Sequence, residues 1–392
     1  MSGVFSNITD LQAAAWDAIC AGHPNVSHGW LRTVAEYSRS PPDLRIFVIR
    51  EGGRLLGAAA CHVVSEDGSR SINDRLLGRA AWMRHVPGLD LRPALICGVG
   101  AAHGATGLLV LSTLAAHERE RITRNLIEML ETYAQEQRLT LIFNNMLETE
   151  ASLGILMGRD YAQTLVMPSV VLPIGWSDVG GYLAYLKSRS RNAFENAKKE
   201  INRCRASGTE VVQSPITDEH ASVVYDLLSA HHRLKNSEPF PYKAGFLSAT
   251  RQYCGDGAAL FLALKDRRVV AAAFTLQQAH TMWSAFVGMD RPRCTDNSAY
   301  FNITFHAPAR DAIRLHVRKI VLGPGAYDAK LKRGGHLVRR HVLVRRWRSA
   351  SHRFTRSWLR WYERWHMAKH AELYARNRGY ISRESARSFR LE

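Results

Sequence analysis

A glycine turn followed by a cluster of cations is the stretch of the sequence best suited to chemistry. It reads Ile320-Val-Leu-Gly-Pro-Gly-Ala-Tyr-Asp-Ala-Lys-Leu-Lys-Arg-Gly-Gly335, so an apolar run gives way to glycines and then to positive charge. Glycines let backbone approach a ligand, and cations beside such a turn can neutralise a phosphate or the oxyanion that develops during acyl transfer. The candidate catalytic residues are therefore Lys330, Tyr327 and Asp328.

Two other interpretations of this turn stay open. It could be a basic hairpin loop on the surface, where lysine and arginine are most often found. Asp328 could also form a salt bridge with Lys332 or Arg333 instead of orienting a substrate or moving a proton. Lys332 and Arg333 are candidates for substrate binding, because cations pair with anionic groups.

A second group of cations lies in residues 181–203, which we predict to form one helix or a pair of helices. Its cations form a face that could contact the phosphates of RNA without reading its bases. They are Lys187, Arg189, Lys198, Lys199 and Arg203.

The segment 345–392 combines arginines with aromatic residues at helical spacing. Such a stripe typically docks a helix onto a core. It could also contact RNA through stacking and phosphate pairing, or lie on anionic lipid as an amphipathic helix. The candidates for RNA contact here are Arg345, Arg346 and Arg348.

The composition is that of a soluble, strongly basic globular protein. The chain has 392 residues, and its 53 Lys+Arg against 35 Asp+Glu give a net charge of +18. This length suggests two domains, and this charge favours a polyanionic partner such as RNA, DNA, an acidic membrane surface or a phosphorylated substrate.

The sequence lacks long apolar runs, a signal-peptide layout and paired cysteines, and these absences set our expectations for cellular location and metal binding. No run approaches about eighteen uninterrupted apolar residues, and the first residues lack the charged-then-apolar layout of a signal peptide, so we expect a cytoplasmic protein. The 6 cysteines lie far apart without the paired spacing of zinc sites. We therefore expect them to be reduced and mostly buried, and we expect no metal site.

The predicted elements repeat in the two halves of the chain. Helix, β-hairpin, strand, helix and strand occur in that order before residue 175 and again after it. We predict an α/β fold of two similar domains, each a mixed, mostly antiparallel sheet flanked by helices, at 1–175 and 176–344. A basic aromatic helical tail, 345–392, follows them.

Three motifs resemble those of tandem GNAT-fold acyltransferases of the Fem-like and CelD-like type. They are residues 182–192, the strands within 261–290, and the turn at 323–334. The specific part of the resemblance is 180–335. It implies that Lys330 lies near the reacting carbonyl and Arg191 near the substrate or a tRNA. It also places Tyr300 and His306 on a substrate-binding helix, with His306 where an aromatic residue is common in the family.

Whether the chain contains a pyrophosphate loop indicates its acyl donor. In GNAT enzymes that use acyl-CoA, this loop reads Gln/Arg-x-x-Gly-x-Gly/Ala and binds the phosphates at a strand-to-helix junction. Two strings fit it, Arg54–Ala59 and Arg75–Ala80. The first lies in a predicted hairpin, the second follows no clear strand, and the second half of the chain has no such string. This pattern and the charge favour aminoacyl-tRNA as donor, with no bound cofactor.

The predicted reaction is therefore peptidyltransferase chemistry, in which a small-molecule or cell-wall-precursor amine attacks the aminoacyl ester of a tRNA and forms an amide. Such an activated ester needs orientation, an electrophilic clamp and a route for one proton rather than a catalytic triad. One alternative is an acyl-CoA-dependent N-acyltransferase. The other is a non-catalytic pair of GNAT domains that binds RNA or, through its C-terminal helix, contacts a membrane.

Overall fold

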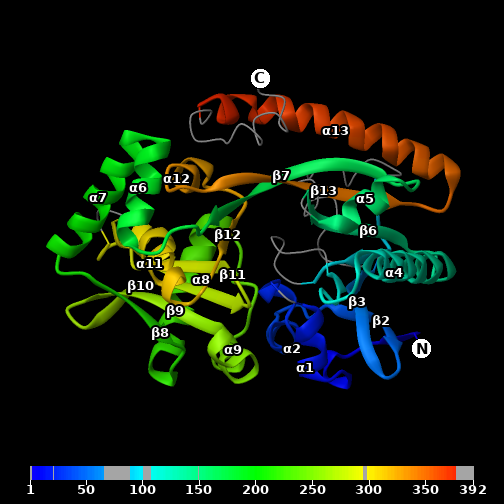
Figure 1. Ribbon diagram of the computed structural model, residues 1–392, viewed down its shortest axis with the longest axis horizontal. Coiled ribbons are helices and arrows are strands. Elements are labelled where there is room, and N and C mark those ends of the chain that lie inside the picture. Colours follow the sequence, from blue (N-terminus) through cyan, green and yellow to red (C-terminus); the bar gives the residue numbers. More distant parts are fainter. Residues whose placement is uncertain are drawn as a thin grey trace. The chain divides into compact units, whose positions relative to one another are not determined.

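The protein is described here by a computed structural model, which covers residues 2–20, 22–65, 89–99, 107–148, 150–294 and 298–376 (Figure 1). The chain divides into two compact units. Unit 1 contains Met1–Ala35, Pro42–Pro168 and Val338–Leu373, and unit 2 consists mainly of Ser169–Leu337 with Glu36–Pro41. Both contain a sheet flanked by helices, so the predicted α/β class is confirmed.

Unit 1 is built from an N-terminal group of helices, a sheet and a long C-terminal helix. Its helices are η1 (Ile8–Asp10), α1 (Ala13–Ile19), η2 (Pro24–Val26), α2 (His28–Tyr37), α4 (Ala116–Glu136), α5 (Ala151–Met157) and α13 (Ser349–Arg376). Its strands are β1 (Ser2–Phe5), β2 (Asp43–Glu51), β3 (Arg54–Val64), β4 (Ala94–Cys97), β5 (Leu108–Val110), β6 (Thr140–Leu147) and β13 (His336–Arg345), with the start of β7 (Ala162–Pro173).

Unit 2 also combines helices with the strands of a sheet. Its helices are α6 (Val179–Arg189), α7 (Arg191–Ala206), α8 (Asp218–Asn236), α9 (Phe246–Cys254), η4 (Gly255–Gly257), α10 (Ser298–Phe301), η5 (Asn302–His306), α11 (Ala307–Arg314) and α12 (Tyr327–Leu331). Its strands are β8 (Glu210–Pro215), β9 (Ala258–Lys265), β10 (Arg268–Gln278), β11 (Thr281–Met289) and β12 (Lys319–Gly323), with the end of β7.

The two units share one order of strand pairing, to which unit 1 adds β5, paired antiparallel with β3. In unit 1, β1, β2, β3 and β4 pair antiparallel in sequence, and β4 pairs parallel with β6 after helix α4. In unit 2, β8, β9, β10 and β11 pair antiparallel, and β11 pairs parallel with β12 after helix α11. Each unit thus contains the hairpin, strand, helix and parallel strand that the sequence predicted twice.

The last strand of each half belongs to the other half's sheet. Strand β7 follows β6 in the chain, yet its end pairs antiparallel with β12 in unit 2. Strand β13 follows β12, yet it pairs antiparallel with β6 in unit 1. The compact units therefore differ from the contiguous segments 1–175, 176–344 and 345–392, because the chain crosses at β7 and returns at β13, and α13 packs within unit 1.

Helices cover the sheets through close apolar contacts. In unit 1, α4 packs on β2 and β3 with Ile122, Leu126 and Leu130 buried. In unit 2, α8 packs on β10 and β11. A Cβ added at Gly288 of β11 would lie 2.4 Å from the backbone carbon of Leu227, so only glycine allows this approach. These contacts fix the frame on which the unit 2 loops stand.

Candidate functional site

One carboxylate joins three elements of unit 2. Glu200 projects from α7 and accepts a hydrogen bond from Nε2 of His306, on η5, through Oε2 at 2.8 Å. Arg333, in the turn after α12, donates from Nε to the same Oε2 at 3.0 Å and from Nη2 to Oε1. The guanidinium is bidentate and largely buried, since the Arg333 side chain is 8% exposed. This cluster, Glu200–His306–Arg333, thus brings an acid, a histidine and an arginine together inside unit 2.

The protonation of the cluster follows from its hydrogen bonds. A carboxylate can only accept, so Nε2 of His306 carries a proton and Nδ1 is free to accept from the Tyr182 hydroxyl at 3.3 Å. Burial lowers the pKa of His306, against the opposing effect of Glu200, so its imidazole is neutral at pH 7. Burial alone would raise the pKa of Glu200, but hydrogen bonds from His306 and Arg333 outweigh it and hold that pKa below its usual value.

Arg333 is also held by aromatic rings and backbone. Its guanidinium carbon lies 3.6 Å from the centroid of Phe301 and 5.3 Å from that of Phe305. Its Nη1 donates to the carbonyl of Ala329 at 2.7 Å. Stacking and ion pairing together suit arginine and not lysine, because only the planar guanidinium can do both. Arg333, predicted to bind substrate, is thus engaged inside the protein.

Lys330 ties together the backbone of the glycine turn. It is 7% exposed, and Nζ donates to the carbonyls of Leu322, Gly323 and Pro324 at 2.6, 3.0 and 2.8 Å. An ammonium group has three protons, so these bonds use its full donor capacity. The predicted action of Lys330 on a developing oxyanion would require it to release one of these carbonyls.

The backbone around this turn departs from regular geometry at two places. Ala326, which caps α12, has φ +47° and ψ +39°, a left-handed conformation that disfavours residues with a Cβ. Residues 302–306 form one turn of π-helix, which carries His306. Strained residues and π-turns cluster at functional sites, so both independently favour a functional role for this part of unit 2.

The end of the turn packs closely against α6 and β7. A Cβ at Gly335 would lie 2.4 Å from Cγ1 of Val170. The Tyr185 hydroxyl donates to the Gly334 carbonyl at 2.8 Å, and Nη1 of Arg189 lies 2.9 Å from Nε2 of His336. Because a guanidinium only donates, this nitrogen of His336 is an acceptor and its ring is neutral.

Replacing His336 is expected to flatten the acid dependence of stability. Burial, with Arg189 nearby, lowers the pKa of His336 to about 4. Between about 6.5, the unfolded value, and about 4, the unfolded chain binds a proton that the folded chain does not, so stability falls as pH falls. For His336→Gln the slope of unfolding free energy between these pH values should drop by up to about 1.4 kcal/mol per pH unit. Urea titrations at several pH values measure it, and an unchanged slope would contradict the assignment.

The other predicted residues of the turn and helices fall into two groups. Tyr327 is buried and Tyr300 half-buried, whereas Asp328 and Lys332 are exposed. On α6 and α7, Arg189 is half-buried. The remaining cations there are all exposed: Lys187, Arg191, Lys198, Lys199 and Arg203. Of the two predicted alternatives, one helix or a pair, the structure has the pair, with the break at Ser190, whose extended backbone caps α7.

The cations at the end of β13 lie in unit 1. Arg345 pairs with Glu131 at 2.7 Å and lies over the Trp347 ring, and Arg346 is half-buried. Arg348 is exposed. Arg345 was predicted to lie in the tail, but it is the last residue of β13, and the helix begins at Ser349. Of these three candidates, Arg348 is the exposed side chain.

Glu200 is the residue that sequence reasoning missed. It was one acid within a basic helix, with nothing in the local pattern to show that it faces inward. Its place on the helix gives a signal in retrospect, because Ala193, Ala197, Glu200 and Cys204 recur at helical spacing and the other three are buried. An acid on the buried stripe of a helix needs a cationic partner.

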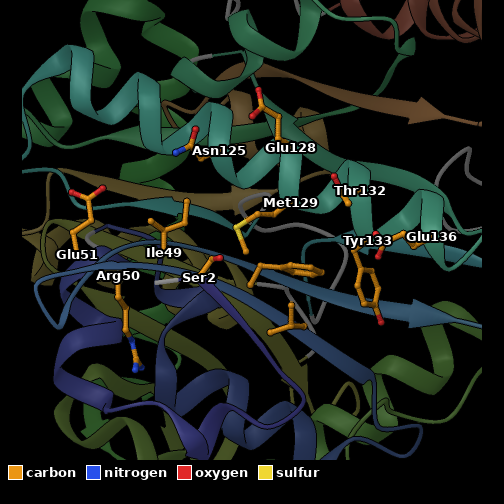
Figure 2. A pocket seen from close by; sticks show the side chains of 12 residues that line it. Ser2, Ile49, Arg50, Glu51, Asn125, Glu128, Met129, Thr132, Tyr133 and Glu136 are labelled. Atoms are coloured by element: carbon orange, nitrogen blue, oxygen red, sulfur yellow. The ribbon is translucent and has the colours of Figure 1, made fainter.

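Unit 1 contains a groove, and none of the candidate site residues predicted from the sequence lines it. It has a volume of about 670 Å3 and lies between α4 and the strands β1 and β2 (Figure 2). Asn125, Glu128, Met129, Thr132 and Tyr133 of α4 line one side. Of the two strings that fit a pyrophosphate loop, Arg54–Ala59 lies inside strand β3, and 75–80 lies outside the described residues.

Metal-ligating and membrane-spanning features are absent from the part of the chain that the structure describes. There, no group of three His, Cys, Asp or Glu could hold a metal ion. None of the helices searched has the length and hydropathy needed to cross a bilayer. The cysteines are free thiols, five buried and Cys254 half-buried, as predicted.

Comparison with known proteins agrees with this fold. The chain resembles FemX, with 11% identity over 85% of this chain and 96% of that one and a TM-score of 0.52. It also resembles the C-terminal domain of a putative lysylphosphatidylglycerol synthetase from Agrobacterium fabrum, with 11% identity, 88% and 95% coverage and a TM-score of 0.54. A tandem GNAT protein from the clavulanic acid biosynthesis pathway matches at 12% identity, 88% and 98% coverage and a TM-score of 0.43.

No curated protein sequence matches the chain. The model of the FemAB-like family, described as peptidoglycan biosynthesis/recognition, matches residues 7–380. That match covers nearly the whole chain and includes both units. The Fem-like resemblance predicted from the sequence is therefore confirmed: the chain belongs to the FemAB-like family.

Proposed function

We propose that the protein transfers an aminoacyl group from an aminoacyl-tRNA to the amine of a small acceptor, such as a cell-wall precursor. The observation that carries the proposal is the two-sided character of α7. Its outer side bears exposed cations, among them Lys198, Lys199 and Arg203, while Glu200 on its inner side holds His306 and Arg333. The same helix therefore links the exposed cations to the turn that carries Arg333.

The outer side of α6 and α7 suits a nucleic-acid backbone. Exposed lysines and arginines bind phosphates and release counterions, which gives affinity without base reading. Lys187 and Lys198 both lie against the Phe194 ring, at 5.8 and 5.2 Å from its centroid, so the two ammonium groups are held on one patch. An acyl-CoA donor needs far fewer phosphate contacts than this surface offers.

The reaction needs few groups from the protein. The acceptor nitrogen attacks the ester carbonyl carbon, a C–N bond forms, the bond to the terminal ribose oxygen breaks, and the proton lost by the amine ends on that oxygen. Exposed Lys332 and Asp328, beside the turn, are the groups we assign to binding and orienting the reactants. The buried cluster and Lys330 hold the turn in place, and preorganisation of this kind accounts for much of enzymatic rate enhancement.

Removing two cations from α7 is expected to weaken tRNA binding and to make that binding less dependent on salt concentration. For the double variant Lys198→Ala with Lys199→Ala, the slope of log affinity against log salt should fall in magnitude by about two. Filter binding at several salt concentrations measures the slope. The matched control is Arg233→Ala with Lys235→Ala, two exposed cations at the end of α8, which should leave the slope unchanged.

The transfer assay then tests the donor. The purified protein is incubated with charged tRNA and an amine acceptor, with and without RNase, and in parallel with acyl-CoA. Product that forms only from charged tRNA and disappears with RNase supports the proposal. Product that forms from acyl-CoA and is indifferent to RNase would contradict it.

A further inference from the structure

Helix α13 presents two opposite faces with different surroundings. Leu359 and Tyr362 are buried at 1% and 3% exposure, in one apolar cluster with Val342 and Val344 of β13. This face docks the helix onto unit 1. Core docking, one of the interpretations of the aromatic stripe, therefore accounts for only part of it.

The other face carries two parallel rows of side chains. Phe354, Trp361 and Trp365 are 46%, 46% and 39% exposed. Their spacing of seven and four residues places them in one row along the helix. Arginines stand one position before each of them and form the adjacent row, also exposed: Arg353, Arg360 and Arg364.

Such a face is unusual for a surface that meets only water. Large aromatic side chains are rarely left exposed in a row, and here they are not interspersed with acids. Residues 353–364 contain one acidic residue, Glu363, which is half-buried and lies off the exposed face. Aromatic residues beside arginines match the boundary of an anionic bilayer, where rings enter the headgroup layer and guanidinium groups meet lipid phosphates.

We propose that this exposed face of α13, Arg353–Trp365, binds peripherally to the surface of an anionic lipid bilayer. The argument is charge complementarity together with the single aromatic row, on a chain whose net charge is +18. The inference is independent of the proposed function. Vesicle binding and aminoacyl transfer can each succeed or fail alone.

Vesicle flotation of the full chain tests the proposal. The protein should float with phosphatidylcholine vesicles that contain phosphatidylglycerol and not with phosphatidylcholine alone. Each arginine near such a surface contributes about fivefold in affinity, so Arg353→Ser, Arg360→Ser and Arg364→Ser together should weaken binding about 100-fold. Replacing Phe354, Trp361 and Trp365 by serine should weaken it about 10–100-fold at unchanged charge.

A matched control separates this face from general electrostatic attraction. Lys198→Ser, Lys199→Ser and Arg203→Ser remove the same charge from α7 and should weaken vesicle binding by less than about threefold. Circular dichroism and unfolding midpoints show whether each variant is folded, and the arginine and aromatic sets serve as independent tests. The proposal is overturned if vesicles of pure phosphatidylcholine bind the protein equally well, or if the α7 variant weakens vesicle binding as much as the variant without the three α13 arginines. It is also overturned if replacing the three aromatic residues reduces tRNA binding but not vesicle binding.

Discussion

Replacing Lys330 with methionine is expected to lower the unfolding free energy by about 3–5 kcal/mol and the transfer rate by about 100-fold. The ammonium group is buried and joins three carbonyls of the turn, so its removal leaves those oxygens unpaired away from water. The turn should then shift by an amount that misplaces the exposed residues beside it. Urea unfolding measures the first effect, and single-turnover transfer measures the second.

The neighbour Lys332 provides the control, because it is exposed and two positions away. Lys332→Met should change stability by less than about 0.5 kcal/mol while weakening substrate binding. If Lys330→Met instead abolished transfer with no loss of stability, its amino group would act on the substrate rather than on the backbone. That result would support the role that the sequence alone predicted for Lys330.

The repeated order of elements could be predicted because its signals are local. The hairpin of β2 and β3 has glycines at its turn and alternating or continuous apolar strands, and α4 has an apolar stripe at helical spacing. The exchange of β7 and β13 could not be predicted in this way. Strand pairing between β7 and β12, or between β13 and β6, joins residues far apart in the chain, and each strand reads the same whichever partner it has.

The sequence singled out residues of the candidate site, but it could not show how they are arranged relative to one another. The glycine turn and its cations were recognised from residue type, and Arg333 and His306 were both named. Residue type does not show which cations turn inward, so Lys330 and Arg333 could not be separated from exposed Lys332. Arg333 can turn inward because Glu200 lies there: the bidentate carboxylate offsets the loss of water around the guanidinium.

Replacing Glu200 with alanine should be among the most destabilising substitutions in unit 2, at about 3–5 kcal/mol. It would leave a buried guanidinium without its carboxylate and His306 without the acceptor for Nε2. A control on the same helix, Glu195→Ala, removes an exposed acid and should change stability by less than about 0.5 kcal/mol. Urea unfolding of the two variants under the same conditions gives the comparison.

A double variant shows whether the effect comes from the ion pair. In Glu200→Gln with Arg333→Met, both charges are gone, and the methionine can still pack on Phe301. The single variants for comparison are Glu200→Gln and Arg333→Met, and each leaves one charge of the buried pair without its partner. The double variant should therefore lose clearly less stability than the sum of the losses of these two single variants. Additive losses would mean that Glu200 and Arg333 act separately. Transfer activity should remain low in the double variant even if stability recovers, because Arg333 would no longer join the turn to the helix that we propose contacts tRNA.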